Sequence, residues 1–204
     1  DAPYKSRVYN GYNNPIPETE LVFGPNITDW PTFYPLADKL LMRVASVITD
    51  PITTTDELIP SGDTSSYRSN PEKLSSFALS RKDPNYVGEA KAERENERRR
   101  RAGEHVEALD GVYPAIGAEN PDDVMLASVV LAERPGDGSA REQAASCQRV
   151  LGGVANIALE YATKRYRSNL INWGMLPFTK KSEISAKVGD YIYIDGIREA
   201  VANG

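Results

Sequence analysis

An apolar run from Val124 to Leu131 is followed, a few residues later, by the loop Gly136-Asp137-Gly138-Ser139 and a segment of helical character. This order predicts a buried strand that ends in a glycine turn and opens into a helix. The first N–H groups of a helix have no intrahelical partner, and the helix dipole adds positive potential there. The loop is therefore a candidate anion site.

Two side chains at this loop suit chemistry on an acidic substrate. The Ser139 hydroxyl is a potential base or nucleophile, and the Arg141 guanidinium is suited to gripping a carboxylate. A purely structural interpretation is also open, because Ser139 followed three residues later by Glu142 has the spacing of a capping box. The sequence leaves both interpretations standing.

The remaining apolar segments predict further strands over 40–48, 154–159 and 187–194, with an extended segment at 175–178. Helices are predicted over 140–151, over the residues up to Trp173, and within the charged stretch 89–109. Alternation of strands and helices indicates an α/β fold with βαβ units, in which ligands bind outside the carboxyl ends of strands.

The first 35 residues differ in character from the rest. They hold six prolines among Asn, Gly and Tyr, which suits an extended arm better than regular structure. We therefore expect an extended arm or linker over 1–35 and one folded domain over 36–204, a length that can bury a sizeable core.

Charge, cysteine content and hydropathy limit the classes of partner and the cellular compartment that we expect for this chain. The formal charge of −5 and the pI near 5.1 disfavour nucleic acid and membrane surfaces as partners, since both attract a positive field. A single cysteine, Cys147, allows no intramolecular disulfide and no thiolate-held metal cluster within this chain. The sequence has no signal-peptide pattern and no apolar stretch of about 20 residues. A cytoplasmic protein with a small-molecule partner is the expectation.

The four arginines 98–101 raise the question of nucleic-acid binding. Neighbouring glutamates nearly cancel their charge, and the pairs Glu95/Arg99 and Glu97/Arg101 have the spacing of ion pairs on one helix face. We interpret the segment as a solvated helix face. The only histidine, His105, is expected at the surface.

Four motifs, in order, are similar to those of one family. They are Thr54-Thr55-Asp56 with Ile59-Pro60-Ser61-Gly62, then Tyr67-Arg68, then Gly138-Ser139-Ala140-Arg141-Glu142 with Leu151-Gly152-Gly153, and finally Asn169-Leu170-Ile171-Asn172-Trp173-Gly174-Met175-Leu176-Pro177-Phe178. Together they resemble the C-terminal swivelling domain of the aconitase superfamily over roughly residues 40–195.

The resemblance implies a swivelling β/β/α domain that closes over an active site shared with other domains. Those domains would bind the 4Fe-4S cluster, so no metal ligand is expected in this chain. The chain would be the C-terminal part of a larger aconitase-like hydro-lyase, or a separate small subunit like that of isopropylmalate isomerase. Because the sequence begins at Asp1 and not at a methionine, we expect a piece of a longer protein. The substrate would be a hydroxy di- or tricarboxylic acid.

Residue roles follow from the resemblance position by position. Ser139 matches the catalytic serine that removes a proton from the carbon next to a substrate carboxylate. Arg141 and Arg68 match arginines that bind substrate carboxylates, and Asp56 matches an active-site aspartate.

Three positions depart from the family pattern. Ala140 replaces a second serine, and Gln143 and Glu57 replace histidines. These changes put citrate and isocitrate in doubt as substrates. The loss of a hydroxyl at Ala140 leaves room for a binding or regulatory module that kept the fold without catalysis. By analogy with aconitases that also bind RNA, the resemblance leaves RNA binding through 94–101 as a further alternative.

Overall fold

The computed structural model describes residues 11–116 and 123–204. Its strands are β1 (Lys39–Ile48), β2 (Thr53–Thr54), β3 (Val124–Ala132), β4 (Pro135–Asp137), β5 (Gly153–Ala158), β6 (Leu176–Thr179) and β7 (Tyr191–Ile194). Its helices are α2 (Thr55–Leu58), α3 (Pro71–Ser75), α4 (Tyr86–Arg101), α5 (Tyr113–Ile116), α6 (Arg141–Val150), α7 (Lys164–Asn172) and α8 (Ile197–Asn203), with 3-10 turns at Ser65–Tyr67 and Glu107–Leu109.

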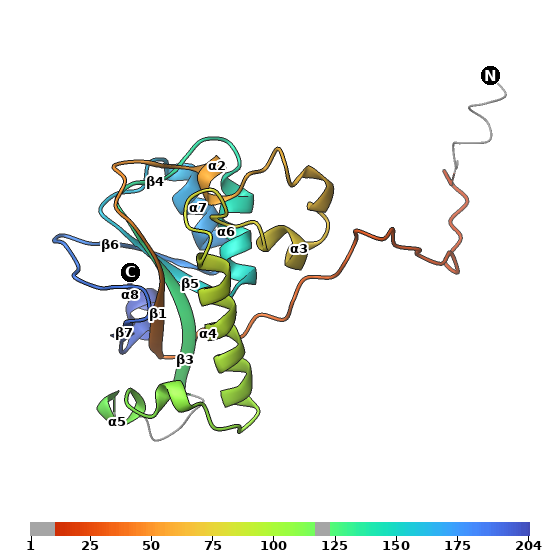
Figure 1. The fold of residues 1–204 in the computed structure, drawn as a ribbon. Coiled ribbons are helices and arrows are strands. Elements are labelled where there is room, and N and C mark those ends of the chain that lie inside the picture. The colour runs from red at the N-terminus through yellow and green to blue at the C-terminus, as the bar shows by residue number, and fades with distance from the viewer. Residues whose placement is uncertain (1–10, 117–122) are drawn as a thin grey trace.

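The main sheet of the described residues has the strand order β6-β5-β3-β1-β7. β1, β3, β5 and β6 run parallel, and β7 is the antiparallel edge strand beside β1. Figure 1 shows α4, α6 and α7 on one side of this sheet and α8 on the other. The expected mixed α/β fold is confirmed, and β3, buried at every position, forms its centre.

The parallel pairing of β1 with β3 resumes beyond the main sheet. After β1 the chain enters β2, after β3 it enters β4, and these two short strands pair in parallel as a second ladder. The N–H of Thr53 donates to the carbonyl of Arg134 at 3.0 Å, which links the two connections. The β1–β2 and β3–β4 connections therefore leave the carboxyl ends of two central strands side by side.

The two larger hydrophobic cores lie against the two faces of the sheet. On one face, α4, α6 and α7 pack with side chains such as Ala45 and Val130. On the other, Met42 and Val129 pack with Ile197 of α8 and with the segment after β6. The alternation of side chains along β1 directs Leu40, Met42 and Val44 to this second core.

The predicted solvated face of α4 is wrong in part. Glu97 and Arg100 are buried, and their side chains bond to each other at 2.9 Å. Glu97 also accepts from the N–H of Leu126 at 3.1 Å, and Arg100 donates to the carbonyl of Val124 at 2.7 Å. β5 pairs with β3 only from Ser128 onward, so these charged side chains satisfy backbone groups at the start of β3 that no strand covers.

Other boundaries also differ from the sequence expectations. α4 ends at Arg101, with Gly103 at a positive φ of 78°, so the predicted helix does not continue to residue 109. The predicted strand over 187–194 is regular only in β7, because residues before Asp190 form a turn. His105 is exposed, as expected, and Cys147 is buried in α6.

Residues 11–38 contain no helix or strand. The end of this segment lies on the folded part of the chain: Trp30 packs on Trp173, and the Tyr34 ring lies 4.2 Å from the guanidinium carbon of Arg101. The first ten residues of the predicted arm lie outside the described part of the chain. The division at residue 35 stays a prediction.

Candidate functional site at the β4–α6 loop

The β2–β4 ladder brings two sequence motifs together. Thr54 and Asp137 are partners in this parallel ladder. Asp56 lies two residues beyond Thr54, and Ser139 lies two residues beyond Asp137. The Thr-Thr-Asp motif and the glycine loop therefore emerge at the same edge, although more than 80 residues separate them in the sequence.

Close packing fixes the path of the glycine loop. Gly138 has φ +133°, and a β-carbon there would lie 2.2 Å from Oγ1 of Thr55. Gly136 has φ +97°, and a β-carbon there would lie 2.2 Å from the Tyr166 ring. Neither position has room for a side chain, so both glycines are required by this fold. The carbonyl of Gly136 also accepts from the Thr163 hydroxyl at 3.0 Å.

The loop borders a hollow of about 320 Å³. Its walls are Ser61, Arg68, Ser139, Ala140, Glu142 and Gln143. Two of the predicted site residues, Ser139 and Arg68, thus line one hollow, and both side chains are exposed. Ser61 also belongs to it, and the family motif Ile59–Gly62 was the only signal for that residue.

The structural interpretation of Ser139 as a helix cap is wrong. The N-cap of α6 is Ala140, and no side chain caps this end of the helix. Glu142 does not reach back to the cap, because its carboxylate accepts from the indole N–H of Trp173 at 3.1 Å. The Ser139 hydroxyl is therefore not committed to capping, and the first N–H groups of α6 lack a side-chain partner.

Asp56 and Arg141 do not line this hollow. Asp56, whose side chain is 58% exposed, is ion-paired with Arg81. Arg81 also contacts Asp63 at 2.5 Å. Arg141 is half-buried at the first turn of α6, and its Nε is buried without a hydrogen-bond partner among the described residues.

A capping box does exist, on α2. The hydroxyl of Thr54 accepts from the N–H of Glu57 at 3.2 Å, and the N–H of Thr54 donates to the Glu57 carboxylate at 2.7 Å. This backbone hydrogen bond, with further help from the Thr54 hydroxyl and Lys82, lowers the pKa of Glu57. Glu57, one of the positions that departs from the family pattern, therefore fixes the start of α2 and the position of Asp56.

Arg81 and Lys82 are charge partners that sequence reasoning missed. Lys82 contacts Asp50 at 2.7 Å and Glu57 at 3.2 Å, so it links the two ends of the β1–α2 connection. Lysine and arginine beside a turn carry no periodic signal, and only the fold brings them to the Thr-Thr-Asp motif.

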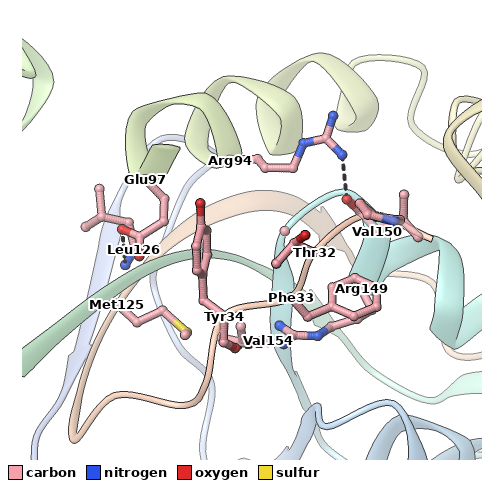
Figure 2. A pocket seen from close by; sticks show the side chains of 12 residues that line it. Thr32, Phe33, Tyr34, Arg94, Glu97, Met125, Leu126, Arg149, Val150 and Val154 are labelled. Carbon is pink, nitrogen blue, oxygen red and sulfur yellow. Dashed lines mark hydrogen bonds between the residues drawn. The ribbon is translucent and has the colours of Figure 1, made fainter. Parts of the chain in front are cut away.

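A second cavity lies under the arm and has a different character. About 70 Å³ in volume, it lies between the arm at 31–34, α4, β3 and the end of α6. Figure 2 shows Phe33 and Tyr34 reaching into it, with Arg94 bonded to the carbonyl of Val150 at 2.7 Å. Its wall is mainly apolar. It is best explained as space left where the arm packs on the domain.

Neither a metal site nor a membrane span is found in the described residues. No group of three His, Cys, Asp or Glu side chains is placed there to hold a metal ion. Burial raises the pKa of the Cys147 thiol, which disfavours the thiolate that a metal needs. No helix over 11–116 or 123–204 is long and apolar enough to cross a membrane.

The arginines 98–101 are all engaged by glutamates. Arg98 contacts Glu95 at 2.6 Å and Arg99 contacts Glu104 at 3.0 Å. Glu97 binds both Arg100 and Arg101. Of the two predicted pairs, the structure forms Glu97 with Arg101, while Glu95 pairs with Arg98 in place of Arg99. This arrangement offers little uncompensated positive charge to a nucleic acid.

Comparison with known families finds a match over part of the chain. Residues 89–183 match the family described as the aconitase C-terminal domain. The match contains the Ser139 loop and the 169–178 motif, and it confirms the resemblance to the aconitase superfamily. It does not extend to Asp56 or Arg68.

One solved structure to which this chain is similar is the 3-isopropylmalate dehydratase LeuD of Methanocaldococcus jannaschii. The two chains are 23% identical, the alignment covers 79% of this chain and 73% of that one, and the TM-score is 0.48. No curated protein matches the sequence.

Proposed function

We propose that this chain is the swivelling domain of an aconitase-like hydro-lyase that dehydrates or hydrates a hydroxy di- or tricarboxylic acid. One observation supports this most: an exposed serine, Ser139, shares a hollow with Arg68 at the uncapped start of α6. The hollow combines a hydroxyl, a guanidinium and free helix N–H groups, which is a suitable environment for an acidic substrate.

In this proposal Arg68 binds a substrate carboxylate and orients the adjacent carbon toward Ser139. The Ser139 oxygen accepts the proton from that carbon, and the electron pair forms the new carbon–carbon double bond as the β-hydroxyl leaves. Serine is a weak base in water, so its alkoxide requires stabilisation by N–H donors and positive charge. The start of α6 supplies the N–H groups, and Arg68 supplies the charge.

We assign supporting roles to the two other predicted residues. Arg141 follows Ser139 by two positions, and its guanidinium, half-buried at the first turn of α6, is assigned to a second substrate carboxylate. Asp56 acts through its ion pair with Arg81, which holds positive charge beside the α2 end of the site.

A 4Fe-4S cluster would polarise the departing hydroxyl, and we place it outside this chain, because the donor set of the described residues does not fit a cluster. The cluster-bearing domains are the proposed macromolecular partner, on the same chain or on a large subunit.

The test is proton exchange by the complete protein. The coding sequence upstream of Asp1 is first read for three cysteines, two of them close together, to obtain the cluster-bearing part. The assembled protein is then incubated in D₂O with malate, citrate, isocitrate and 2-isopropylmalate, and deuterium at carbon is measured by mass spectrometry. Incorporation into one of these acids, lost in Ser139→Ala, supports the proposal. No incorporation into any hydroxy acid favours the binding or regulatory module, to which Ala140 also points.

A further inference from the structure

The two tryptophans of the chain lie against each other. Trp30 belongs to the arm and Trp173 to the end of α7, and their ring centroids are 4.6 Å apart. Phe33 adds an edge-on contact to Trp173 at 6.3 Å with an interplanar angle of 79°. Two aromatic rings from the arm thus pack on one indole.

The same indole reaches the candidate site. Its N–H donates to Oε1 of Glu142 at 3.1 Å, and Glu142 lines the hollow together with Arg68 and Ser139. A continuous series of contacts therefore runs from the arm, through Trp173, to a charged wall of the hollow.

The negative charge of Glu142 makes its position matter for the binding of an anion in the hollow. A carboxylate on the first turn of α6 competes with an anionic ligand for the helix N–H groups and for Arg68. A hydrogen bond from Trp173 fixes the Glu142 carboxylate on the side of α7 and limits the rotamers of a side chain that lines the hollow.

We propose that Trp173 is a positioning residue that holds the Glu142 carboxylate on the α7 side of the hollow, away from the helix N–H groups and Arg68, and that docking of Trp30 and Phe33 strengthens this hold. Arm docking then raises the affinity of the hollow for carboxylates, and by linkage a bound carboxylate favours the docked arm. This inference rests on the proposed function only in taking the ligand to be a carboxylic acid.

The arm has further anchors that keep its position when one ring is changed. Phe33 also packs against the guanidinium of Arg149 at 4.9 Å, and Arg149 donates to the carbonyl of Tyr34 at 3.3 Å. A change at Trp30 therefore tests the contact with Trp173 while the rest of the 33–34 segment remains attached.

The first experiment measures malate binding to the full chain by NMR titration. Trp173→Phe keeps an aromatic ring and removes the N–H, and Trp30→Ala removes the ring that covers it. Both are expected to weaken malate binding about 3- to 10-fold, whereas Trp30→Phe, which keeps a ring, stays close to the unaltered chain. In a Glu142→Gln background, Trp173→Phe is expected to have no effect, because the charge that it releases is gone.

Equal malate affinity in Trp173→Phe and the unaltered chain overturns the inference. So does an equal loss with and without Glu142→Gln, because that result reports altered packing alone. If Arg68→Ala abolishes binding while Trp173→Phe does not change it, the proposed function stands and this inference fails.

A second measurement needs no ligand. The near-UV circular dichroism of the stacked tryptophans reports arm docking, and Glu142→Ala is expected to reduce it, because the carboxylate that anchors Trp173 is removed. Ser66→Ala, at an exposed position outside the hollow, is the control. An unchanged signal in Glu142→Ala overturns the coupling, even if the unaltered chain binds no malate and the proposed function has failed.

Discussion

Gly138 lies against Thr55 so closely that a β-carbon on the glycine would be 2.2 Å from the threonine hydroxyl oxygen. This contact joins the glycine loop to the first residue of α2. The relative position of the two motifs is therefore determined by packing of the Gly138 backbone on the Thr55 side chain, not by side-chain charge. The contact between Gly138 and Thr55 therefore fixes the position of the Ser139 loop at an exposed edge of the fold.

Substituting Gly138 by alanine is expected to destabilise the protein by about 2–4 kcal/mol, since it adds a clash to an unfavourable φ of +133°. Urea unfolding measures the loss. Gly62→Ala is the matched control, because a β-carbon there meets nothing within 4 Å and φ is ordinary. Similar stability of the two variants would show that the contact is not maintained in solution.

Thr54→Ala removes the N-cap of α2 and is expected to cost about 1 kcal/mol of unfolding free energy. Denaturant unfolding is the measurement. Thr19→Ala, on an exposed part of the arm, serves for comparison and is expected to leave stability unchanged. A neutral Thr54→Ala would contradict the capping assignment.

The Glu57 carboxylate makes the stability of α2 dependent on pH. Its pKa is lowered in the folded protein by the N–H of Thr54, so its contribution is complete above the unfolded-state pKa of about 4.3 and is lost as pH falls through the lower folded value. The unfolding free energy of Glu57→Gln, measured at pH 7 and pH 3, is expected to fall below that of the unaltered chain mainly at pH 7. An equal difference at both pH values would contradict this.

Glu93 has the opposite behaviour. It is fully buried on α4, with Tyr191 and Asn96 donating to one oxygen at 3.1 and 3.0 Å, and burial raises its pKa. Because the folded pKa lies above the unfolded one, the native state loses stability as pH rises through the folded value. Glu93→Gln is expected to raise Tm more at pH 8 than at pH 4, by thermal unfolding. A larger gain at pH 4 would show that the carboxyl is not buried in its neutral form.

The apolar runs predicted the central strands well. The run Val124 to Leu131 forms β3, and the run 40–48 forms most of β1. A strand that is buried on both faces needs a continuous run of apolar residues, and such a short run is typical of a central parallel strand. The loop between β4 and α6 was also predictable, because glycines before a helical pattern leave few alternatives.

The charged residues were less predictable. A stretch rich in Glu and Arg such as 93–101 is usually solvated. The sequence pattern gives no sign that Glu97 and Arg100 form hydrogen bonds with backbone groups at the start of β3. Likewise, the Ser139/Glu142 spacing fits a capping box, but Trp173 takes the glutamate. Such choices depend on tertiary neighbours and not on local spacing.

The most direct test of the account is the kinetics of Ser139→Ala in the complete protein. Ser139 is exposed and caps no helix, so we expect unfolding free energy within about 0.5 kcal/mol of the unaltered protein. With the acid that shows exchange as substrate, kcat is expected to fall about 10²- to 10⁴-fold while KM changes little, and Ser66→Ala leaves both constants unchanged. A Ser139→Ala protein that is folded and retains its full kcat would contradict the assignment of this serine as the base.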